Sequence, residues 1–276
     1  MIFVRKAWKK FCRTLQGGGH ISIPASQVNE ATAPNYLVLK HDVETNVKKA
    51  FEIAKIEHEF GHCGSYYVQA YLLKDEKNVA MLQKMQEMGH EISYHYDVMD
   101  SNRGDLAKAI EEFDENKRRF EACGFEILTV CQHGNPVVTR VGYTSNRDFF
   151  RSEEVQNRYP NVSDIMVNFQ TCRGTTYRYY SDAGRTFKFI YDPINNDICN
   201  SDDKNIPYDD LDALYPVLIS SNAILSMHPH RWESNALVYR CKSAIFRVIR
   251  CCAKIAMKVP FLKKIMSRYY FLAKKI

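Results

Sequence analysis

Residues 36–44, Tyr-Leu-Val-Leu-Lys-His-Asp-Val-Glu, join a short apolar run to a group of His and carboxylate side chains. The run is typical of a buried strand, and the group from His41 to Glu44 stands at its end. Three later stretches have the same form, namely residues 89–97 (GHEISYHYD), 131–136 (CQHGNP) and 227–232 (MHPHRW). Strands that bring such side chains to one rim are how a barrel builds a metal-dependent hydrolytic site.

Strand-like and helix-like segments alternate through the middle of the chain. Apolar residues at helical spacing predict helices over residues 46–60, 78–88, 105–123 and 208–218. Apolar runs predict strands over residues 36–39, 65–68, 90–96, 125–130, 166–169, 187–191 and 223–227. Repeated βα units give a parallel sheet or barrel, and one α/β barrel commonly uses a chain of 276 residues.

The charge of the chain is unevenly distributed. The net charge is +6, yet residues 1–13 carry five Lys or Arg and no acid, and residues 231–276 carry twelve against Glu233 alone. The intervening body is therefore acidic, which argues against nucleic acid as a partner. Basic ends suit an anionic membrane surface.

The chain lacks export signals and membrane-spanning runs. Residues 1–16 are basic but have no apolar core or small-residue cleavage site, and no apolar run is long enough to span a bilayer. Nine cysteines without a CxxC pair are consistent with reduced thiols. We expect a cytoplasmic protein at the inner face of the membrane.

The C-terminal residues 240–276 have the pattern of a basic amphipathic tail. The bases Arg247, Arg250, Lys254 and Lys258 recur every three or four residues, with apolar residues on the other faces and a break at Pro260. Such a helix lies in the headgroup layer of a membrane. The alternative is a helix that packs its apolar face on the barrel.

The strand ends hold the candidate site residues. Asp42 and Glu44 point the same way because side chains alternate along a strand, and two adjacent carboxylates suit a divalent metal with a base beside it. His95 and His133 also stand at strand ends. His90 faces away from His95, so we expect it to be structural and bonded to backbone.

The order of these motifs resembles polysaccharide deacetylases, carbohydrate esterase family 4. The matching features are Asp42 at the first strand end, Gly89-His90-Glu91-Ile92-x-x-His95, and a late apolar strand that ends at His228. The divergent bacterial branch with a His-Asp-Val-Asp opening and a closing His-Pro-x-x-Trp, found in surface-polysaccharide biosynthesis, is the most similar. The resemblance covers Tyr36 to Trp232. It implies an α/β fold, namely a distorted or incomplete (β/α) barrel. It also implies an enzyme that removes N- or O-acetyl groups from sugars with the help of a divalent metal, often zinc.

The resemblance also implies roles for individual residues. Asp42 matches the general base, His95 the first metal histidine, and His228 the histidine that protonates the leaving group. The metal-binding aspartate of the family is Val43 here, so Glu44 is the implied replacement, and Asp42 and Glu44 can exchange roles.

Two family positions are changed in this chain. The second metal histidine falls on Met99, so His133 or Asp97 is the implied substitute. The arginine-proline motif is not recognisable, and residues 132–136 occupy its place. The implied metal ligands are Glu44, His95 and His133.

Further polar residues near the motifs are candidates for contacts with sugar. These candidates are Asn135, Arg147, Asp148, His230 and Trp232. Arg147 and Asp148 suit a surface ion pair equally well, and His230 can instead cap the edge of the sheet.

The sequence therefore predicts three parts: a basic segment and linker (1–34), a deacetylase-like barrel (35–232) and a basic helical tail (233–276). The expected substrate is an acetylated sugar or lipid-linked glycan in surface-polysaccharide or lipopolysaccharide biosynthesis. Two alternatives remain open. One is a non-catalytic glycan-binding or scaffold barrel at the membrane. The other is a different metal-dependent hydrolase, such as a phosphoesterase with a second metal.

Overall fold

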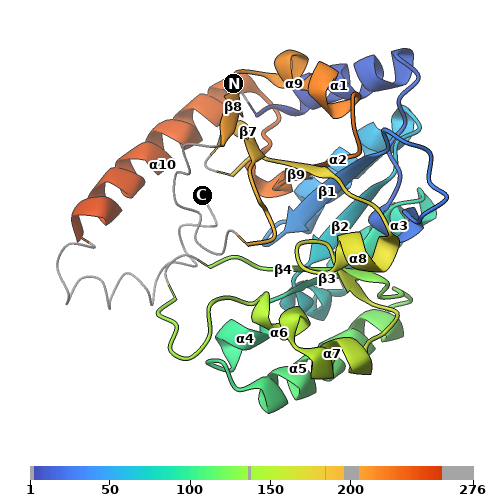
Figure 1. Ribbon diagram of the computed structural model, residues 1–276. Helices are drawn as coiled ribbons and strands as arrows, with labels where there is room; N and C mark the ends of the chain where they lie inside the picture. The colour runs from blue at the N-terminus through green and yellow to red at the C-terminus, as the bar shows by residue number, and fades with distance from the viewer. Residues whose placement is uncertain (1–2, 136–137, 184, 196–204, 257–276) are drawn as a thin grey trace.

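The computed structural model describes residues 3–256 except 136–137, 184 and 196–204 (Figure 1). Its described strands form one nine-stranded sheet in the order β5-β4-β3-β2-β1-β9-β6-β7-β8. The parallel strands are β1 (Leu37–Val43), β2 (Gly64–Val68), β3 (Glu91–Tyr96), β4 (Thr129–Gln132), β5 (Ser163–Asp164), β6 (Arg178–Ser181) and β9 (Ala223–Met227). The antiparallel strands at one end are β7 (Phe187–Ile190) and β8 (Ile206–Tyr208).

The strand at the centre of the sheet is β1. All seven of its residues are buried, as expected for a strand that is covered on both faces. Its register places His41 beside Tyr66 of β2 and beside Met227 of β9. The strands β1, β2, β3, β4 and β9 run parallel, so their carboxyl ends share one rim.

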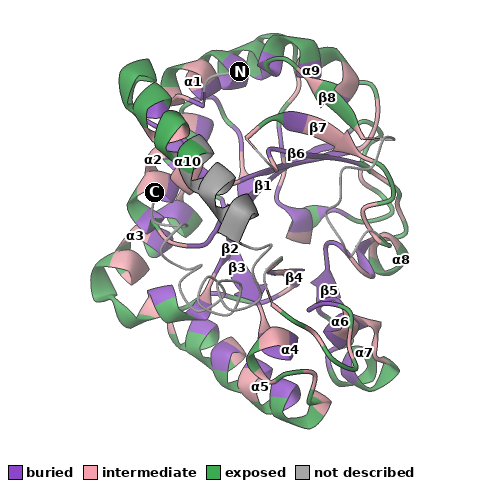
Figure 2. Ribbon diagram, turned by 90° about the vertical axis from the view of Figure 1, so that its left-hand side faces the viewer, coloured by how far each residue is buried: buried purple, intermediate pink, exposed green. Residues whose placement is uncertain are grey.

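The strands follow one another around an arc, and the helices lie outside it (Figure 2). Among the described strands, β5 and β8 are the two edges of the sheet. The predicted α/β class is therefore confirmed as a mixed α/β sheet, whereas closure into a barrel is not seen in the described strands.

Three outer helices begin directly after a side chain that caps them. Helices α2 (Val47–Glu59), α3 (Glu76–Glu87) and α5 (Leu106–Ala122) follow Asn46, Asp75 and Asp105. Each of these three side chains accepts a hydrogen bond from a backbone N–H in the first turn, which satisfies a donor that the helix leaves unpaired. The predicted helices at these three places are confirmed.

Helices from both ends of the chain complete the outer layer. Helix α1 (Arg5–Gly17) and helix α9 (Leu211–Leu218) pack on the sheet through Trp8, Phe11 and Leu214. These side chains form one apolar core with Leu39 of β1, which we call the outer core. The shorter helices are α4 (Val98–Ser101), α6 (Asp148–Arg151), α7 (Glu153–Arg158) and α8 (Phe169–Arg173). Short 3₁₀ turns are η1 (Ala25–Gln27), η2 (Ala70–Lys74) and η3 (Pro229–Arg231).

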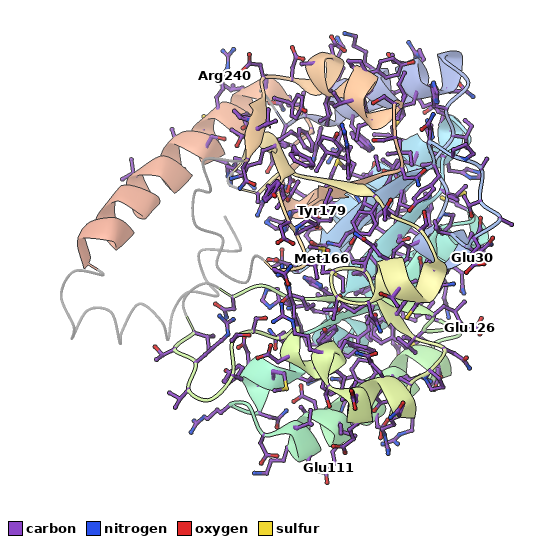
Figure 3. All side chains as sticks on the ribbon, in the orientation of Figure 1. Glu30, Glu111, Glu126, Met166, Tyr179 and Arg240 are labelled. Atoms are coloured by element: carbon purple, nitrogen blue, oxygen red, sulfur yellow. The ribbon has the colours of Figure 1, made fainter. Side chains whose placement is uncertain are left out.

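A separate core fills the inside of the arc. It contains Tyr67, Cys131, Met166 and Tyr179, and the last two are labelled in Figure 3. The predicted strand at 166–169 is wrong. Strand β5 ends at Asp164 because its carboxylate accepts the N–H of Met166, which turns the chain toward α8.

The tail begins with helix α10 (Ala236–Ala256). This confirms a helix for the first part of the predicted tail, while the expected break at Pro260 lies outside the described residues. Within residues 3–256, apart from the gaps given above, no helix is both long enough and apolar enough to cross a bilayer.

Candidate active site at the carboxyl ends of the strands

Five predicted side chains meet at the rim, and we call them the rim cluster. They are Asp42, Glu44, His95, His133 and His228. One potential ligand atom from each of Glu44, His95 and His133 lies within 4.8 Å of the others. The Nε2 atom of His228 lies 3.8 Å from a carboxylate oxygen of Asp42 and 3.8 Å from one of Glu44. The structure therefore brings together the residues that the sequence predicts to converge.

His95 is oriented by the neighbouring strand. It pairs in register with Cys131 of β4, and its Nδ1–H donates to the carbonyl oxygen of Cys131 at 3.0 Å. That bond leaves the lone pair of Nε2 available on the other side of the ring. Burial lowers the pKa of His95 to about 3, so the imidazole is neutral at physiological pH. A neutral, oriented imidazole is what a metal ligand requires.

His133 is positioned by the chain just after β4. Its N–H donates to the carbonyl oxygen of Tyr96 at 2.7 Å, and its own carbonyl accepts from Asn146 Nδ2 at 2.8 Å. The Nε2 atom lies 3.6 Å from Glu44 Oε1, and Nδ1 lies 3.8 Å from Asp97 Oδ2. Both carboxylates are therefore close to the His133 ring.

Met99 stands at the position where the resemblance implies a second metal histidine. It lies on α4 and is buried in the apolar core between the sheet and the outer helices. Its side chain therefore belongs to the packing of that core, and His133 supplies the second imidazole of the rim cluster. The sequence leaves both His133 and Asp97 open as the substitute, and these two side chains lie 3.8 Å apart.

Lys40, which the sequence motifs did not single out, is a buried cation beside the rim cluster. Its Nζ donates to both carboxylate oxygens of Asp42, at 2.6 and 2.7 Å, and to Ser226 Oγ at 3.2 Å. Burial alone would lower the pKa of Lys40, but the charge of Asp42 raises it well above its usual value. Burial alone would raise the pKa of Asp42, but Lys40 lowers it. The pair is therefore ionised.

Asp182 is a second residue that the sequence analysis overlooks. It follows β6, which pairs with β9 in the register Ser181 to Ser226. Asp182 accepts from His228 Nδ1–H at 2.5 Å and from Arg231 Nη1 at 2.9 Å. Burial would raise the pKa of Asp182, but Arg231 and His228 lower it strongly. An ionised Asp182 fixes the His228 ring with Nε2 toward Asp42 and Glu44.

Signals for these two residues exist in the sequence. Lys40 stands two residues before Asp42 on the same strand, so both side chains point to the same face. Asp182 follows the short aromatic run Tyr179-Tyr180 and stands at a strand end, like Asp42.

The donor set of the rim cluster fits a divalent metal. Two imidazoles and one carboxylate are a ligand set that zinc accepts in hydrolytic sites. A second possible set, Asp42, His95 and Cys131, shares His95 with the first. Burial raises the pKa of the Cys131 thiol well above its usual value, which disfavours the thiolate that would bind a metal. We therefore prefer Glu44, His95 and His133.

The predicted sugar contacts fall into different places. His230 lies beside the rim cluster, with its ring 5.7 Å from that of His228, and burial lowers its pKa to about 3. Asn135 follows the same segment as His133 and is partly exposed. Arg147 is buried, and its Nη1 donates to the carbonyl oxygen of Ile194. Asp148 accepts from Thr144 Oγ1 and forms an ion pair of 2.9 Å with Arg151.

Trp232 requires a correction. Its side chain is fully buried, with ring centroids 5.1 Å from Phe3 and 5.4 Å from Trp8. A residue enclosed by aromatic rings of the outer core cannot touch a sugar. The chain turns back after η3, and this turn places Trp232 on the outer core rather than at the rim.

His41 and His90 lie on the outer face of the sheet. The N–H of Gly64 donates to His90 Nδ1 at 3.0 Å, and His90 Nε2–H donates to the carbonyl oxygen of Ala54 at 3.1 Å. This confirms His90 as a structural residue bonded to backbone. His41 stacks on the Tyr66 ring, with centroids 4.2 Å apart.

Comparisons with known proteins add little to this picture. No protein-family model matches the chain, and no curated protein matches it. A solved structure that resembles it is a variant of the peptidoglycan deacetylase PdaC from Bacillus subtilis. The likeness has a TM-score of 0.36 and 8% identity, and it covers 68% of this chain and 87% of that chain. This similarity is too weak to carry an argument, so the interpretation rests on the residues.

Proposed function

We propose that the protein is a metal-dependent deacetylase that removes an N- or O-acetyl group from a sugar in surface-polysaccharide or lipopolysaccharide biosynthesis. The observation that carries this proposal is the rim cluster. Two imidazoles and a carboxylate are within 4.8 Å of one another, and the His228–Asp182 pair faces the same carboxylate. The sugar and the biosynthetic context come from the resemblance in the sequence.

The chain supplies a place for one divalent metal, such as zinc. Glu44, His95 and His133 would hold it, and the bound metal supplies a Lewis acid that polarises a carbonyl group and activates water. The hydrogen bond from His95 to the Cys131 carbonyl fixes the ring in the orientation that this role needs.

Asp42 is the general base in this proposal. Lys40 keeps the Asp42 carboxylate ionised and therefore free of a proton before reaction. The same contact makes Asp42 a weaker base, and a bound metal would compensate by lowering the pKa of the water from which Asp42 takes a proton. Lys40 is a positioning residue, because it acts through Asp42.

His228 is the general acid. Its Nδ1–H is held by Asp182, and its Nε2 faces the carboxylates of the rim cluster. In the protonated ring, Nε2–H donates a proton to the leaving amine or alcohol as the bond to the acetyl carbon breaks. Asp182 stabilises the cationic ring and prevents its rotation.

The test combines acetate release with metal content. The purified chain is offered N- and O-acetylated sugars and lipid-linked glycans, and metal per chain is measured on the same sample. We expect acetate release with one metal per chain. No metal and no acetate would favour a scaffold or glycan-binding barrel. Two metals with phosphate-ester cleavage would favour a phosphoesterase, although the two candidate ligand sets in the described residues share His95.

A further inference from the structure

We propose that helix α10 docks the protein on an anionic lipid surface through an exposed row of apolar side chains. One side of α10 is attached to the body of the protein. Tyr239 is buried with its ring 5.9 Å from Phe3, and Lys242 forms an ion pair of 3.1 Å with Glu233. Ser243 Oγ accepts from Arg185 Nη1 at 3.3 Å. These contacts define which side of the helix is already occupied.

The opposite side of α10 carries the apolar row. It consists of Leu237, Cys241, Ala244, Ile245 and Val248, all of which are exposed. Leu237 is 72% exposed, Ile245 51% and Val248 63%. Spacings of three, four, seven and eight residues place these side chains on one side of a helix. Figure 2 colours most of this part of α10 as exposed. Single apolar residues are ordinary on a surface, whereas a continuous row marks a contact site.

The positive charge of the C-terminal part of the chain indicates which partner contacts the apolar row. Arg240, labelled in Figure 3, is exposed next to the apolar row. Residues 231–276 carry twelve Lys or Arg and one acid. A second copy of the chain would bring the same positive charge against this helix. Nucleic acid would meet the bases but leave the apolar row in water. The interface of an anionic membrane accepts both the apolar row and the positive charge.

The docking surface lies close to the rim cluster along the chain. His228 directly follows β9, η3 comes next, and α10 begins at Ala236. In Figure 1, α10 runs along the side of the molecule toward which the arrow of β1 points. Docking through α10 therefore brings the carboxyl ends of the strands near the lipid surface. If the proposed function holds, this favours a lipid-linked glycan as substrate, a point that rests on that proposal.

The experiment uses full-length protein and vesicle co-sedimentation. The test variant is I245E/V248E, and the matched control is I206E/V141E. The control replaces the same two residue types at exposed positions outside α10, 55% exposed at Ile206 and 81% at Val141. Both variants add the same charge. We expect wild type to bind phosphatidylcholine vesicles only when phosphatidylglycerol is present, and less in high salt. I245E/V248E should lower the bound fraction roughly tenfold, and the control should leave it nearly unchanged.

Several results would overturn the docking proposal. They are no binding to anionic vesicles by wild type, an equal loss in both variants, binding to a DNA or RNA duplex without binding to vesicles, or a wild-type dimer that I245E/V248E separates. Vesicle binding is measured without turnover. A protein that binds lipid but releases no acetate would therefore overturn the proposed function and leave the docking helix standing.

Discussion

Two clusters of polar side chains, one at the carboxyl ends of the strands and one on the outer face of the sheet, differ in how their histidines are hydrogen-bonded. The rim cluster lies at the carboxyl ends of the strands. The second group, which we call the back cluster, lies under α1 and α2 and consists of Trp8, His41, Glu57, Tyr66 and His90. All of these side chains except His228, which is partly exposed, are buried, and both clusters include a residue of β1.

The back cluster is centred on Glu57. This carboxylate accepts from Tyr66 OH at 2.7 Å and from Trp8 Nε1 at 3.1 Å. His41 Nε2 lies 2.9 Å away, near enough for an ion pair, although it is not well directed for a hydrogen bond. Burial would raise the pKa of Glu57, but the neighbouring His41 lowers it. The side chains that contact Glu57 are fully buried between the outer helices and the sheet.

The difference teaches how to distinguish a site from a buried polar core. In the back cluster both ring nitrogens of His90 are taken by backbone groups, so His90 has no lone pair left for a ligand, and His41 is fully buried between Tyr66 and Glu57. In the rim cluster one nitrogen of His95 and one of His228 is fixed by a partner, and the other faces the carboxylates. Histidines that are half occupied and converge are suited to chemistry.

The largest difference between the two clusters is expected when one histidine is replaced in each. His95→Ala should abolish both turnover and metal binding, because it removes a ligand and leaves the fold intact. His90→Ala should keep metal stoichiometry and lower the free energy of unfolding by about 1–3 kcal/mol, because it leaves the Gly64 N–H unpaired. Metal analysis, acetate release and urea unfolding measure the two variants side by side. Loss of metal in His90→Ala as well would mean that the clusters are not distinct.

Removal of the proposed acid separates catalysis from metal binding within the rim cluster. His228→Ala should lower turnover about 100- to 10,000-fold because proton donation to the leaving group is lost. Metal content should stay at the wild-type level, since His228 is outside the ligand set. Initial rates on an acetylated sugar, with metal measured on the same preparation, test this. Normal turnover in the variant would remove His228 from the mechanism.

The cation beside the rim cluster offers a stability test. Lys40→Met should lower the free energy of unfolding by about 3–5 kcal/mol at neutral pH, because Asp42 is left as a buried charge without its partner. The double variant Lys40→Met with Asp42→Asn should recover part of this loss, since no uncompensated charge remains. Urea unfolding of the three proteins gives the answer. A double variant less stable than Lys40→Met alone would show that the charge pair is not the cause.

The last prediction concerns the buried carboxyl group of Asp164. It accepts from Tyr96 OH and the Met166 N–H, and burial raises its pKa from 3.8 to about 6. A raised carboxyl pKa contributes stability that is present below about pH 4 and is lost as pH rises through about 6, a change of about 3 kcal/mol. Asp42, with a lowered pKa, has the opposite dependence and loses stability as pH falls.

The matched variant for this test is Asp164→Asn, which keeps the acceptor for the Met166 N–H and removes the titration. Urea unfolding between about pH 4 and pH 6 should show the free energy of unfolding of wild type declining relative to that of the variant, because other groups, such as His95 and His230, titrate alike in both proteins. A constant difference between the two proteins across this range would place the titrating group elsewhere.

Much of the local structure follows from the sequence pattern. The apolar run before His41 predicts β1, and the apolar spacing from Asn46 and from Asp105 predicts two helices, because strand alternation and helical periodicity involve residues that are near neighbours in the chain. The helix expected from Asn78 begins two residues earlier, at Glu76, where Asp75 caps it. The same reasoning places His95 at a strand end and turns His90 away from it. The expected strand at 166–169 fails because a turn made by Asp164 and Asn168 overrides the apolar run.

The composition of the rim cluster depends on contacts between distant segments. Asp182 meets His228 because β6 lies beside β9, a pairing that no local pattern reveals. Trp232 enters the outer core because helices from the two ends of the chain meet there. Local periodicity can assign a residue to a strand end, but hydrophobic packing between remote elements selects which strands are neighbours. That selection sets the partners of His95, His133 and His228, and with them the chemistry open to each ring.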